Sequence, residues 1–332
     1  MRVFVIGTGS VGLRHIQNLF DLGCDVYAYS YRGRVPQLNS PFTPRLVASI
    51  EDGWLGNPDA LVIASTADKH LQLAVEAAHR GIHVYVEKPL SVSLSGVDTL
   101  TELVNEKSLV VETGFMLRHH PNLLWIRKYI DQTSLRNILY LRASVGQWLP
   151  DWRPGTHYHL SYSADHSKGG GVIFDLIHEL DLIQWLGGSV QDLSAMAIST
   201  PLLEINTEAV AQILLRLNKN VLAQVHLDYV RPCLGRTLEI ALTDGVLHWD
   251  YARGLVTLST AEVTCIPVHE CPNDFERNHM FLRAMEHFLR RIRDPTTPPV
   301  SSLEDGISAL RLALACYASV SQRCNIRPSE IA

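Results

Sequence analysis

The sequence predicts an α/β protein of two domains: an N-terminal doubly wound parallel sheet, then an α/β domain built on a large, mostly antiparallel open sheet. At 332 residues with 46% apolar content, the chain is long enough and apolar enough for two cores. In its first third, short β-rich apolar runs alternate with segments of helical period, as in a parallel sheet flanked by helices. After Gly114 closely spaced strands and turns take over. We therefore expect domains at residues 1–117 and 118–332.

The first domain is expected to alternate strands with helices. The segment from Lys69 carries Leu71, Val75 and Ala78 at helical spacing and ends in a basic residue followed by Gly81, a common helix terminus. The predicted strands are Val3–Ile6, Asp25–Tyr29, Arg45–Val47, Ala60–Ala64, His83–Val86 and Leu109–Thr113. The predicted helices are Val11–Leu22, Lys69–Arg80 and Gly96–Glu106.

The second domain is expected to form hairpins. Asn218–Asn220 and Asp244–Gly245 place turn residues between neighbouring apolar runs, as antiparallel hairpins require. The predicted strands are Asn137–Trp148, Asp192–Ile198, Ala209–Leu217, Val221–Tyr229, Thr237–Leu242, Val246–Asp250 and Leu255–Ser259. The predicted helices are one that starts at Pro121, then Val172–Leu186, Glu276–Arg293 and Leu303–Gln322.

Composition argues against several classes of partner. The net charge is -5 and the basic residues are scattered, so no nucleic acid is expected. The six cysteines form no C-x-x-C pair, and their wide spacing predicts neither a zinc site nor a disulfide framework. Met1 and Arg2 lead directly into an apolar strand, and no apolar run approaches membrane-spanning length. We expect a cytoplasmic protein with no metal and no membrane partner.

A glycine pattern directly follows the first predicted strand and opens the first predicted helix. Its residues are Gly7, Thr8, Gly9, Ser10, Val11 and Gly12. In this context the first glycine makes a tight turn, the second admits a pyrophosphate, and the third lets the helix pack on the strand. The free N–H groups of the helix then favour the phosphates. The pattern predicts a bound dinucleotide.

The end of the second strand bears on which dinucleotide is bound. An acidic residue there would accept hydrogen bonds from a ribose 2′-hydroxyl, but the chain has Ser30, Tyr31, Arg32 and Arg34. A hydroxyl and two arginines suit a 2′-phosphate, which favours NADP over NAD. The alternative is that the arginines are solvated loop residues and that either cofactor is accepted.

Two further segments contribute candidates for cofactor contacts. Ser65 and Thr66 are small residues that follow the fourth predicted strand, and His70 comes shortly after them. A half-exposed His70 in the first turn of a helix is the competing interpretation. Glu87 and Lys88 end the strand before Pro89, where a dinucleotide-binding fold opens its crevice. A lysine there can act on a substrate oxygen.

The second chemical segment is a glycine triplet, Gly169–Gly171, followed by a predicted helix. On that helix Asp175 and His178 are three residues apart and share a face, near an apolar stripe. Histidine titrates in the working range of most enzymes, which makes His178 the candidate general acid and base. Lys88 would stabilise a developing alkoxide, and Asp175 would orient His178 or hold a substrate hydroxyl. The alternative is a core histidine satisfied by a carboxylate.

Residues 149–168 form a long segment rich in aromatic and basic side chains. Long loops inside compact domains are usually functional, and stacking aromatics beside hydrogen-bonding groups suit a sugar. The substrate candidates are Trp152, Arg153, His157, Tyr158 and Tyr162. The alternative for each of them is an anchor of a structural loop.

The glycine pattern, the Glu87-Lys88-Pro89 triplet and the Asp175/His178 segment, in this order, resemble the Gfo/Idh/MocA oxidoreductase family over nearly the whole chain. The resemblance implies an N-terminal Rossmann domain, a C-terminal domain whose open sheet often mediates homo-oligomers, and NAD(P)-dependent chemistry on sugars or cyclitols. It matches Lys88 and His178 to the catalytic lysine and histidine. It also implies that the segment of Arg118, a further substrate candidate, crosses into the second domain.

One position departs from the family pattern. Better-known members carry the aspartate four residues before the histidine, where this chain has Phe174, so Asp175 is either a shifted equivalent or structural. Residues 145–152 and 162–164, with the Asp175–Asp181 segment, resemble a branch associated with surface-polysaccharide or unusual-sugar pathways.

The expected activity is hydride transfer between nicotinamide and a hydroxyl or keto carbon of a sugar, sugar derivative or cyclitol. The alternatives are a redox-inert, dinucleotide-sensing regulator on the same fold, an NAD-dependent glycosidase, and a reductase of a non-sugar carbonyl or imine.

Overall fold

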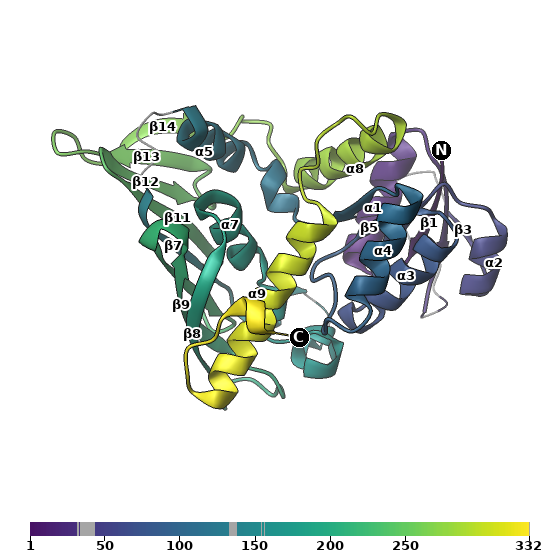
Figure 1. Cartoon of the computed structure of the whole chain (residues 1–332), viewed down its shortest axis with the longest axis horizontal. Helices are drawn as coiled ribbons and strands as arrows, with labels where there is room; N and C mark the ends of the chain where they lie inside the picture. The colour runs from purple at the N-terminus through teal and green to yellow at the C-terminus, as the bar shows by residue number, and fades with distance from the viewer. Residues whose placement is uncertain (32, 34–43, 133–137, 154, 156, 332) are drawn as a thin grey trace. The chain divides into compact units, whose positions relative to one another are not determined.

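The computed structural model describes residues 1–331 except 32, 34–43, 133–137, 154 and 156. The chain divides into two compact units (Figure 1). The first comprises Met1–His119 and Glu276–Ile307, and the second comprises His120–Phe275 and Ser308–Ala332.

The first unit contains a wholly parallel sheet, as the sequence predicts, and its strand order is β3-β2-β1-β4-β5-β6. Its strands are β1 (Arg2–Ile6), β2 (Asp25–Tyr29), β3 (Arg45–Leu46), β4 (Ala60–Ile63), β5 (His83–Val86) and β6 (Val111–Thr113). Its helices are α1 (Ser10–Asp21), α2 (Ile50–Leu55), α3 (His70–His79), α4 (Val97–Lys107) and α8 (Arg277–Arg293). Sequence analysis missed the short α2, which Ser49 caps by accepting a hydrogen bond from Asp52 N.

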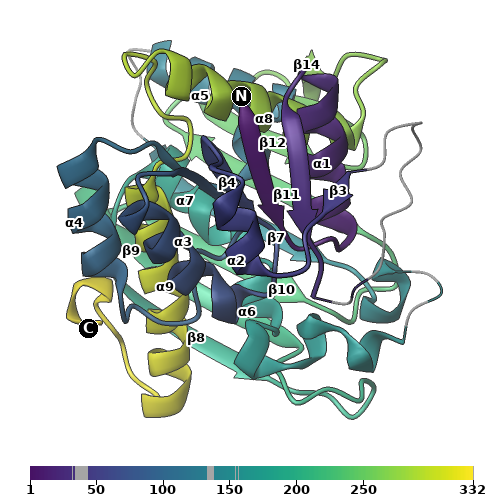
Figure 2. The same cartoon turned by 90° about the vertical axis from the view of Figure 1, so that its right-hand side faces the viewer.

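Helix α8 belongs to the first unit, although sequence analysis placed it in the second domain. Its Ala284, Met285, Phe288 and Leu289 join the core formed by β1, β2 and α1. Both cartoon views show α1 and α8 side by side (Figures 1 and 2). The apolar spacing of an amphipathic helix predicts that it is covered, but not which sheet covers it.

The second unit is built on an eight-stranded sheet of order β14-β13-β12-β11-β7-β10-β9-β8. All neighbours are antiparallel except β7 and β10. The strands are β7 (Ile138–Gly146), β8 (Val190–Ile198), β9 (Val210–Leu217), β10 (Leu222–Asp228), β11 (Gly235–Leu242), β12 (Gly245–Asp250), β13 (Leu255–Ser259) and β14 (Ile266–Glu270). Strand β14 is the one that sequence analysis missed. Its partly exposed residues lack the apolar alternation that marks the other strands.

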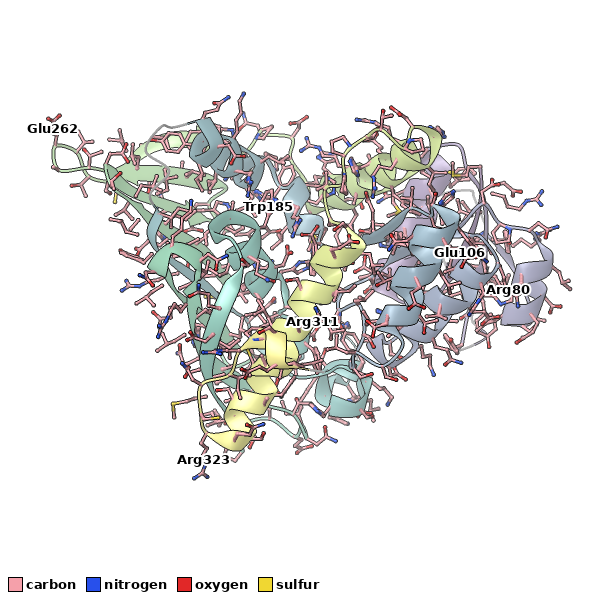
Figure 3. The ribbon with its side chains drawn as sticks, in the orientation of Figure 1. Arg80, Glu106, Trp185, Glu262, Arg311 and Arg323 are labelled. Carbon is pink, nitrogen blue, oxygen red and sulfur yellow. The ribbon has the colours of Figure 1, made fainter. Side chains whose placement is uncertain are left out.

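Helices cover one face of this second sheet. They include α5 (Pro121–Gln132), α6 (Val172–Asp175) and α7 (His178–Gly187), with α7 lying on β7 and β10. Helix α9 spans Leu303–Gln322. Figure 3 shows the side chains along the sheet. On the other face, alternate residues of β8, β9 and β10 are exposed. The exposed apolar residues among them are Met196, Ile198, Leu214 and Leu222.

The short 3₁₀ helices fall mainly between the longer elements. Four of them occupy residues 149–168 of the second unit: η3 (Leu149–Trp152), η4 (Tyr158–Leu160), η5 (Tyr162–Ala164) and η6 (His166–Lys168). Throughout the described part of the chain, every helix is too short or too polar to cross a bilayer.

Candidate functional site

One edge of the first unit's sheet gathers the residues predicted to bind the cofactor. Strand β1 pairs with β2 on one side and β4 on the other, so the chain order reverses there. In open α/β sheets the crevice at such a point, beside the carboxyl ends of the strands, binds ligands. The predicted residues follow these ends in turn: Gly7–Gly12 after β1, Ser30 and Tyr31 after β2, Ser65 and Thr66 after β4, and Glu87 and Lys88 after β5.

The glycine loop has the geometry that a pyrophosphate requires. Gly7 has a φ of +105°, and a Cβ there would collide with the carbonyl of Ala64 at the exit of β4. A Cβ added to Gly9, by contrast, would meet no heavy atom within 4 Å. Gly9 is the N-cap residue of α1 and has no side chain to engage the free N–H groups of the first turn. The loop therefore fits a dinucleotide.

Hydroxyl groups lie at the ends of β1 and β2. Thr8 Oγ1 donates a hydrogen bond to Ser30 Oγ over 2.7 Å, which ties the two strand exits together. Tyr31 is 46% exposed, and its partial burial, followed by Tyr29 and Asp68, raises its pKa to about 12. The Tyr31 hydroxyl consequently stays protonated at neutral pH and can donate a hydrogen bond.

Lys69 is a cation near Tyr31 that sequence analysis did not consider as a cofactor contact. Its Nζ lies 5.3 Å from the centre of the Tyr31 ring and 3.7 Å from an oxygen of Asp68. Arg32 and Arg34, on which the expectation of NADP depends, lie outside the described residues.

His70 is buried rather than half exposed. Its side chain is held between two backbone carbonyls: Nδ1 lies 2.8 Å from Pro89 O and Nε2 lies 3.1 Å from Ser65 O. The residue is only 1% exposed, and burial lowers its pKa. Because the ring is buried and both of its nitrogens face backbone carbonyls, the position favours a structural role over the predicted contact with the cofactor.

Lys88 follows the buried strand β5 and is itself half buried. The preceding residue, Glu87, is buried and pairs with His15 on α1. The peptide bond from Lys88 to Pro89 is cis. Lys88 thus belongs to the same sheet edge as the glycine loop.

In the second unit, Asp175 and His178 do not share one continuous helix, which corrects the prediction. Helix α6 ends at Asp175 and α7 begins at His178, because Leu176, with φ of -103° and ψ of +27°, leaves the helical region. Both residues are nevertheless buried at this junction. A three-residue spacing predicts a shared helical face only where the helix continues.

The Asp175 carboxylate accepts hydrogen bonds from the hydroxyl groups of three other residues. Its Oδ1 accepts a hydrogen bond from Tyr162 at 2.8 Å, and its Oδ2 accepts from Ser163 at 2.7 Å and Tyr229 at 3.1 Å. Burial and the Asp175 charge raise the pKa values of both tyrosines, so both remain donors. This carboxylate therefore fastens residues 162–163 and the exit of β10 to α6.

We expect Asp175→Asn to destabilise the second unit. An amide has one acceptor oxygen in place of two, so a buried hydroxyl loses its partner at a cost of about 1–3 kcal/mol. Urea unfolding followed by circular dichroism measures the loss. The matched control is Asp165→Asn, whose carboxylate holds Ser167 and Lys168 on the surface. Equal stability of the two variants would contradict the prediction that the hydrogen bonds to Asp175 stabilise the second unit.

The glycine triplet serves packing within the protein. A Cβ on Gly170 would collide with the backbone of residues 162–165, and one on Gly171, with φ of +98°, would collide with the Glu208 carboxylate. Glu208 Oε1 accepts hydrogen bonds from Ile173 N at 3.0 Å and from Tyr317 at 2.9 Å. Sequence analysis missed Glu208, which caps α6 from a distant part of the chain.

The substrate candidates in residues 149–168 divide into packed and exposed side chains. Trp152 stands edge-on to Tyr229 at 5.2 Å and donates to Gln147 O at 3.2 Å. The Arg153 guanidinium lies 4.8 Å from the centre of the Tyr162 ring. Tyr158 is half buried and accepts from Glu204 N, whereas His157 is exposed. The packed residues bring the segment next to Asp175.

Glu179, the residue after His178, forms a buried ion pair with Arg236. Glu179 Oε1 lies 2.8 Å from Nε of Arg236, and both side chains are largely covered. Sequence analysis did not find this pair, because Arg236 is on β11, far along the chain.

These features match known protein families in both units. Residues 1–115 match the model of the Gfo/Idh/MocA oxidoreductase family with an NAD-binding Rossmann fold, and residues 123–248 match the model of the Gfo/Idh/MocA C-terminal domain. The chain belongs to the Gfo/Idh/MocA family. It is therefore a dehydrogenase with a nicotinamide-binding Rossmann fold.

Relatives in the family have named activities. The myo-inositol 2-dehydrogenase of Thermotoga maritima is 24% identical over 100% of this chain and 99% of its own length. The UDP-N-acetylglucosamine 3-dehydrogenase of Acidithiobacillus ferrooxidans is 28% identical over 57% of this chain and 55% of its own.

Solved structures of the family share the fold. Levoglucosan dehydrogenase in complex with NADH and L-sorbose has a TM-score of 0.85 at 18% identity, covering 98% of each chain. GenD2 from gentamicin A biosynthesis, in complex with NAD, has a TM-score of 0.80 at 18% identity, covering 98% of this chain and 96% of its own.

Phe174 and Arg118 both have contacts within the protein. Phe174, at the position of the usual aspartate, is buried with its ring 5.0 Å from that of Tyr317. Arg118 is buried and donates to Val300 O at 2.8 Å and to Asp305 at 2.9 Å. These hydrogen bonds favour a role for Arg118 in holding residues 300–305 within the first unit over the predicted contact with substrate.

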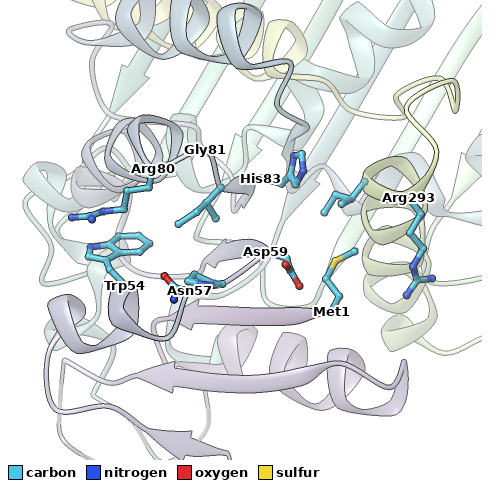
Figure 4. Close-up of a pocket in the computed structure, with 11 residues that line it drawn as sticks. Met1, Trp54, Asn57, Asp59, Arg80, Gly81, His83 and Arg293 are labelled. Carbon is cyan, nitrogen blue, oxygen red and sulfur yellow. The ribbon is translucent and has the colours of Figure 1, made fainter.

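A hollow of about 640 Å³ lies at the opposite edge of the first sheet (Figure 4). Met1, Asp59 and His83 line it at the amino ends of β1, β4 and β5, together with Arg80 and Arg293. Ligands of open α/β sheets bind at the carboxyl ends, so this hollow is not the cofactor crevice. Among the described residues, no group of three or more His, Cys, Asp or Glu side chains is arranged to hold a metal ion.

Proposed function

We propose that this protein oxidises a hydroxyl group, or reduces the corresponding keto group, of a sugar, a sugar derivative or a cyclitol. The observation that carries the proposal is Lys88, which follows β5 at the same sheet edge as a glycine loop shaped for a dinucleotide. The named activities of the inositol and sugar-nucleotide dehydrogenases support this substrate class.

In the proposed reaction Lys88 and His178 have different tasks. A bound nicotinamide would supply the acceptor for the hydride of the carbinol carbon. As the C–H bond breaks, negative charge grows on the substrate oxygen, and the Lys88 ammonium stabilises that charge. His178 takes the hydroxyl proton during oxidation and returns it during reduction. Asp175, whose carboxylate accepts hydrogen bonds from three hydroxyl groups, acts by positioning the segment around His178.

A spectrophotometric panel tests this activity. Polyols, free sugars and nucleotide sugars are each offered with NAD⁺ and NADP⁺, and formation of the reduced cofactor is followed at its absorbance band. We expect oxidation of at least one member of the panel. Tight binding of the cofactor with no oxidation of any member would instead favour a dinucleotide-sensing regulator. Release of a sugar with no net reduction would favour an NAD-dependent glycosidase.

For the cofactor we propose a preference for NADP over NAD. Lys69 and the Tyr31 hydroxyl support it, because both can bind a 2′-phosphate at the end of β2. No carboxylate follows that strand directly.

We expect NADP⁺ to bind more tightly than NAD⁺, and the double variant Arg32→Ala/Arg34→Ala to lose about tenfold or more of its NADP⁺ affinity. Its NAD⁺ affinity should stay within roughly threefold of wild type, because NAD⁺ lacks the 2′-phosphate. Isothermal titration calorimetry measures both dissociation constants. Tighter binding of NAD⁺ to the wild-type protein would refute the preference.

The uncovered face of the second sheet suggests self-association. Met196, Leu214 and Leu222 are exposed apolar residues on three adjacent strands. We propose that two copies of the chain pair through this face. Light scattering coupled to gel filtration should report a dimer or tetramer for wild type and a smaller species for Leu214→Glu. A monomeric wild type would contradict the proposal.

A further inference from the structure

Glu87, the residue before Lys88, is a carboxylate enclosed by protein. It is 8% exposed, and its Oε1 lies 2.7 Å from Nε2 of His15 on α1. On its other side it packs against the backbone of Gly114, where a Cβ would come within 2.9 Å of Oε2. A buried carboxylate is costly unless a donor satisfies it, and His15 supplies that donor.

The surroundings of His15 indicate where its proton lies. The ring is fully buried, packed edge-on against Tyr85 and Phe281. Within the described part of the chain, Nδ1 has no hydrogen-bond partner. A buried N–H without an acceptor is expensive, and the close carboxylate oxygen faces Nε2. We therefore assign the proton to Nε2, which donates to Glu87.

A second histidine holds the residue after Lys88. His70, on α3, has Nδ1 2.8 Å from Pro89 O and Nε2 3.1 Å from Ser65 O. Both neighbours of Lys88 are thus fixed by buried imidazoles from different helices. Each imidazole also lies beside a segment expected to contact the cofactor: His15 is on the helix that begins at the glycine loop, and Nε2 of His70 lies 3.1 Å from Ser65 O at the exit of β4.

We propose that His15, acting through Glu87, is a positioning residue that holds the backbone of Lys88 in its working orientation, with His70 holding the following residue. The kinetic consequence rests on the proposed function, because it requires Lys88 to act on a substrate oxygen. The structural consequence does not, and it can be measured without substrate.

The experiment compares His15→Leu, which removes the donor, with His15→Gln, whose amide N–H can replace Nε2–H. His287→Leu is the matched control, because His287 forms another buried pair with a glutamate in the same unit, 3.0 Å from Glu112. Hydrogen exchange of the peptide covering residues 86–90 is followed by mass spectrometry. The Glu87 amide in this peptide donates to Ile63 O.

We expect faster exchange of residues 86–90 in His15→Leu, wild-type exchange there in His287→Leu, and recovery in His15→Gln. With a substrate from the panel, kcat of His15→Leu should fall about 10²-fold, as expected for a misplaced catalytic group. Its KM and cofactor dissociation constant should stay within roughly threefold of wild type. Should His15→Leu fail to fold, His15→Phe is measured in the same way, because it keeps a planar ring in the buried site and removes the Nε2–H donor.

Wild-type exchange of residues 86–90 in His15→Leu would overturn the inference, whatever the activity. Equal loosening in His287→Leu would also overturn it, because the effect would then reflect general destabilisation. Faster exchange in an enzyme whose wild type oxidises nothing in the panel would leave the inference standing and reject the proposed function.

Discussion

Lys88→Met should abolish turnover while leaving the protein folded and able to bind its cofactor. The substitution keeps a side chain of similar length and removes the ammonium that would stabilise the developing alkoxide. Loss of one such electrostatic group costs about 10²–10³-fold in kcat. Steady-state kinetics measure kcat, and fluorescence titration measures the dissociation constant of the cofactor, which should change little because phosphate binding depends on the glycine loop.

Lys107→Met is the matched control. This lysine ends α4 in the same unit, and its Nζ donates to the carbonyl of His79 on the surface. It should keep wild-type kinetics. Turnover of Lys88→Met at the wild-type rate would refute the role of Lys88, whereas loss of cofactor binding in the same variant would place its main contribution in binding.

For His178→Ala we expect a fall in kcat of about 10²–10⁴-fold, the usual contribution of a general acid or base. Because the substitution leaves space at the junction of α6 and α7, added imidazole should restore part of the rate. No such rescue is expected for Lys88→Met, since imidazole does not replace a fixed cation. The measurement is initial rate against imidazole concentration.

His79→Ala, at the exposed end of α3, controls for the loss of a histidine as such. Circular dichroism checks that His178→Ala remains folded, because the residue is buried. Full activity without imidazole would exclude His178 as the proton carrier. Lost activity with no rescue and unchanged folding would restrict its role to orienting the substrate.

Local patterns predicted the first sheet and the cofactor edge. The strands are short apolar runs bounded by turns, and the glycine pattern is typical of the first strand-to-helix turn of a dinucleotide-binding fold. The positions of Gly7 and Lys88 at the carboxyl ends of β1 and β5 were therefore predictable from adjacent sequence alone. The open second sheet was likewise predicted from turn residues and alternation, apart from β14.

Long-range contacts account for what the sequence did not reveal. Nothing near His15 indicates that it bonds to Glu87, and nothing near Gly171 indicates that Glu208 occupies the space beside it. The break between Asp175 and His178 has the same origin, because hydroxyls from other segments hold Asp175 at the end of α6. Periodicity describes one element at a time, whereas these pairs depend on how elements meet.

Because α8 completes the core of the first unit, that unit cannot finish folding early in synthesis. The nucleotide-binding unit starts at Met1, but its core stays open on one side until the helix beginning at Arg277 has emerged. Synthesis at about 5–20 residues per second separates these events by on the order of ten seconds. During that interval the apolar surface awaiting Met285 and Phe288 is exposed in the nascent chain. The core of the first unit is thus completed only after most of the second unit has been synthesised.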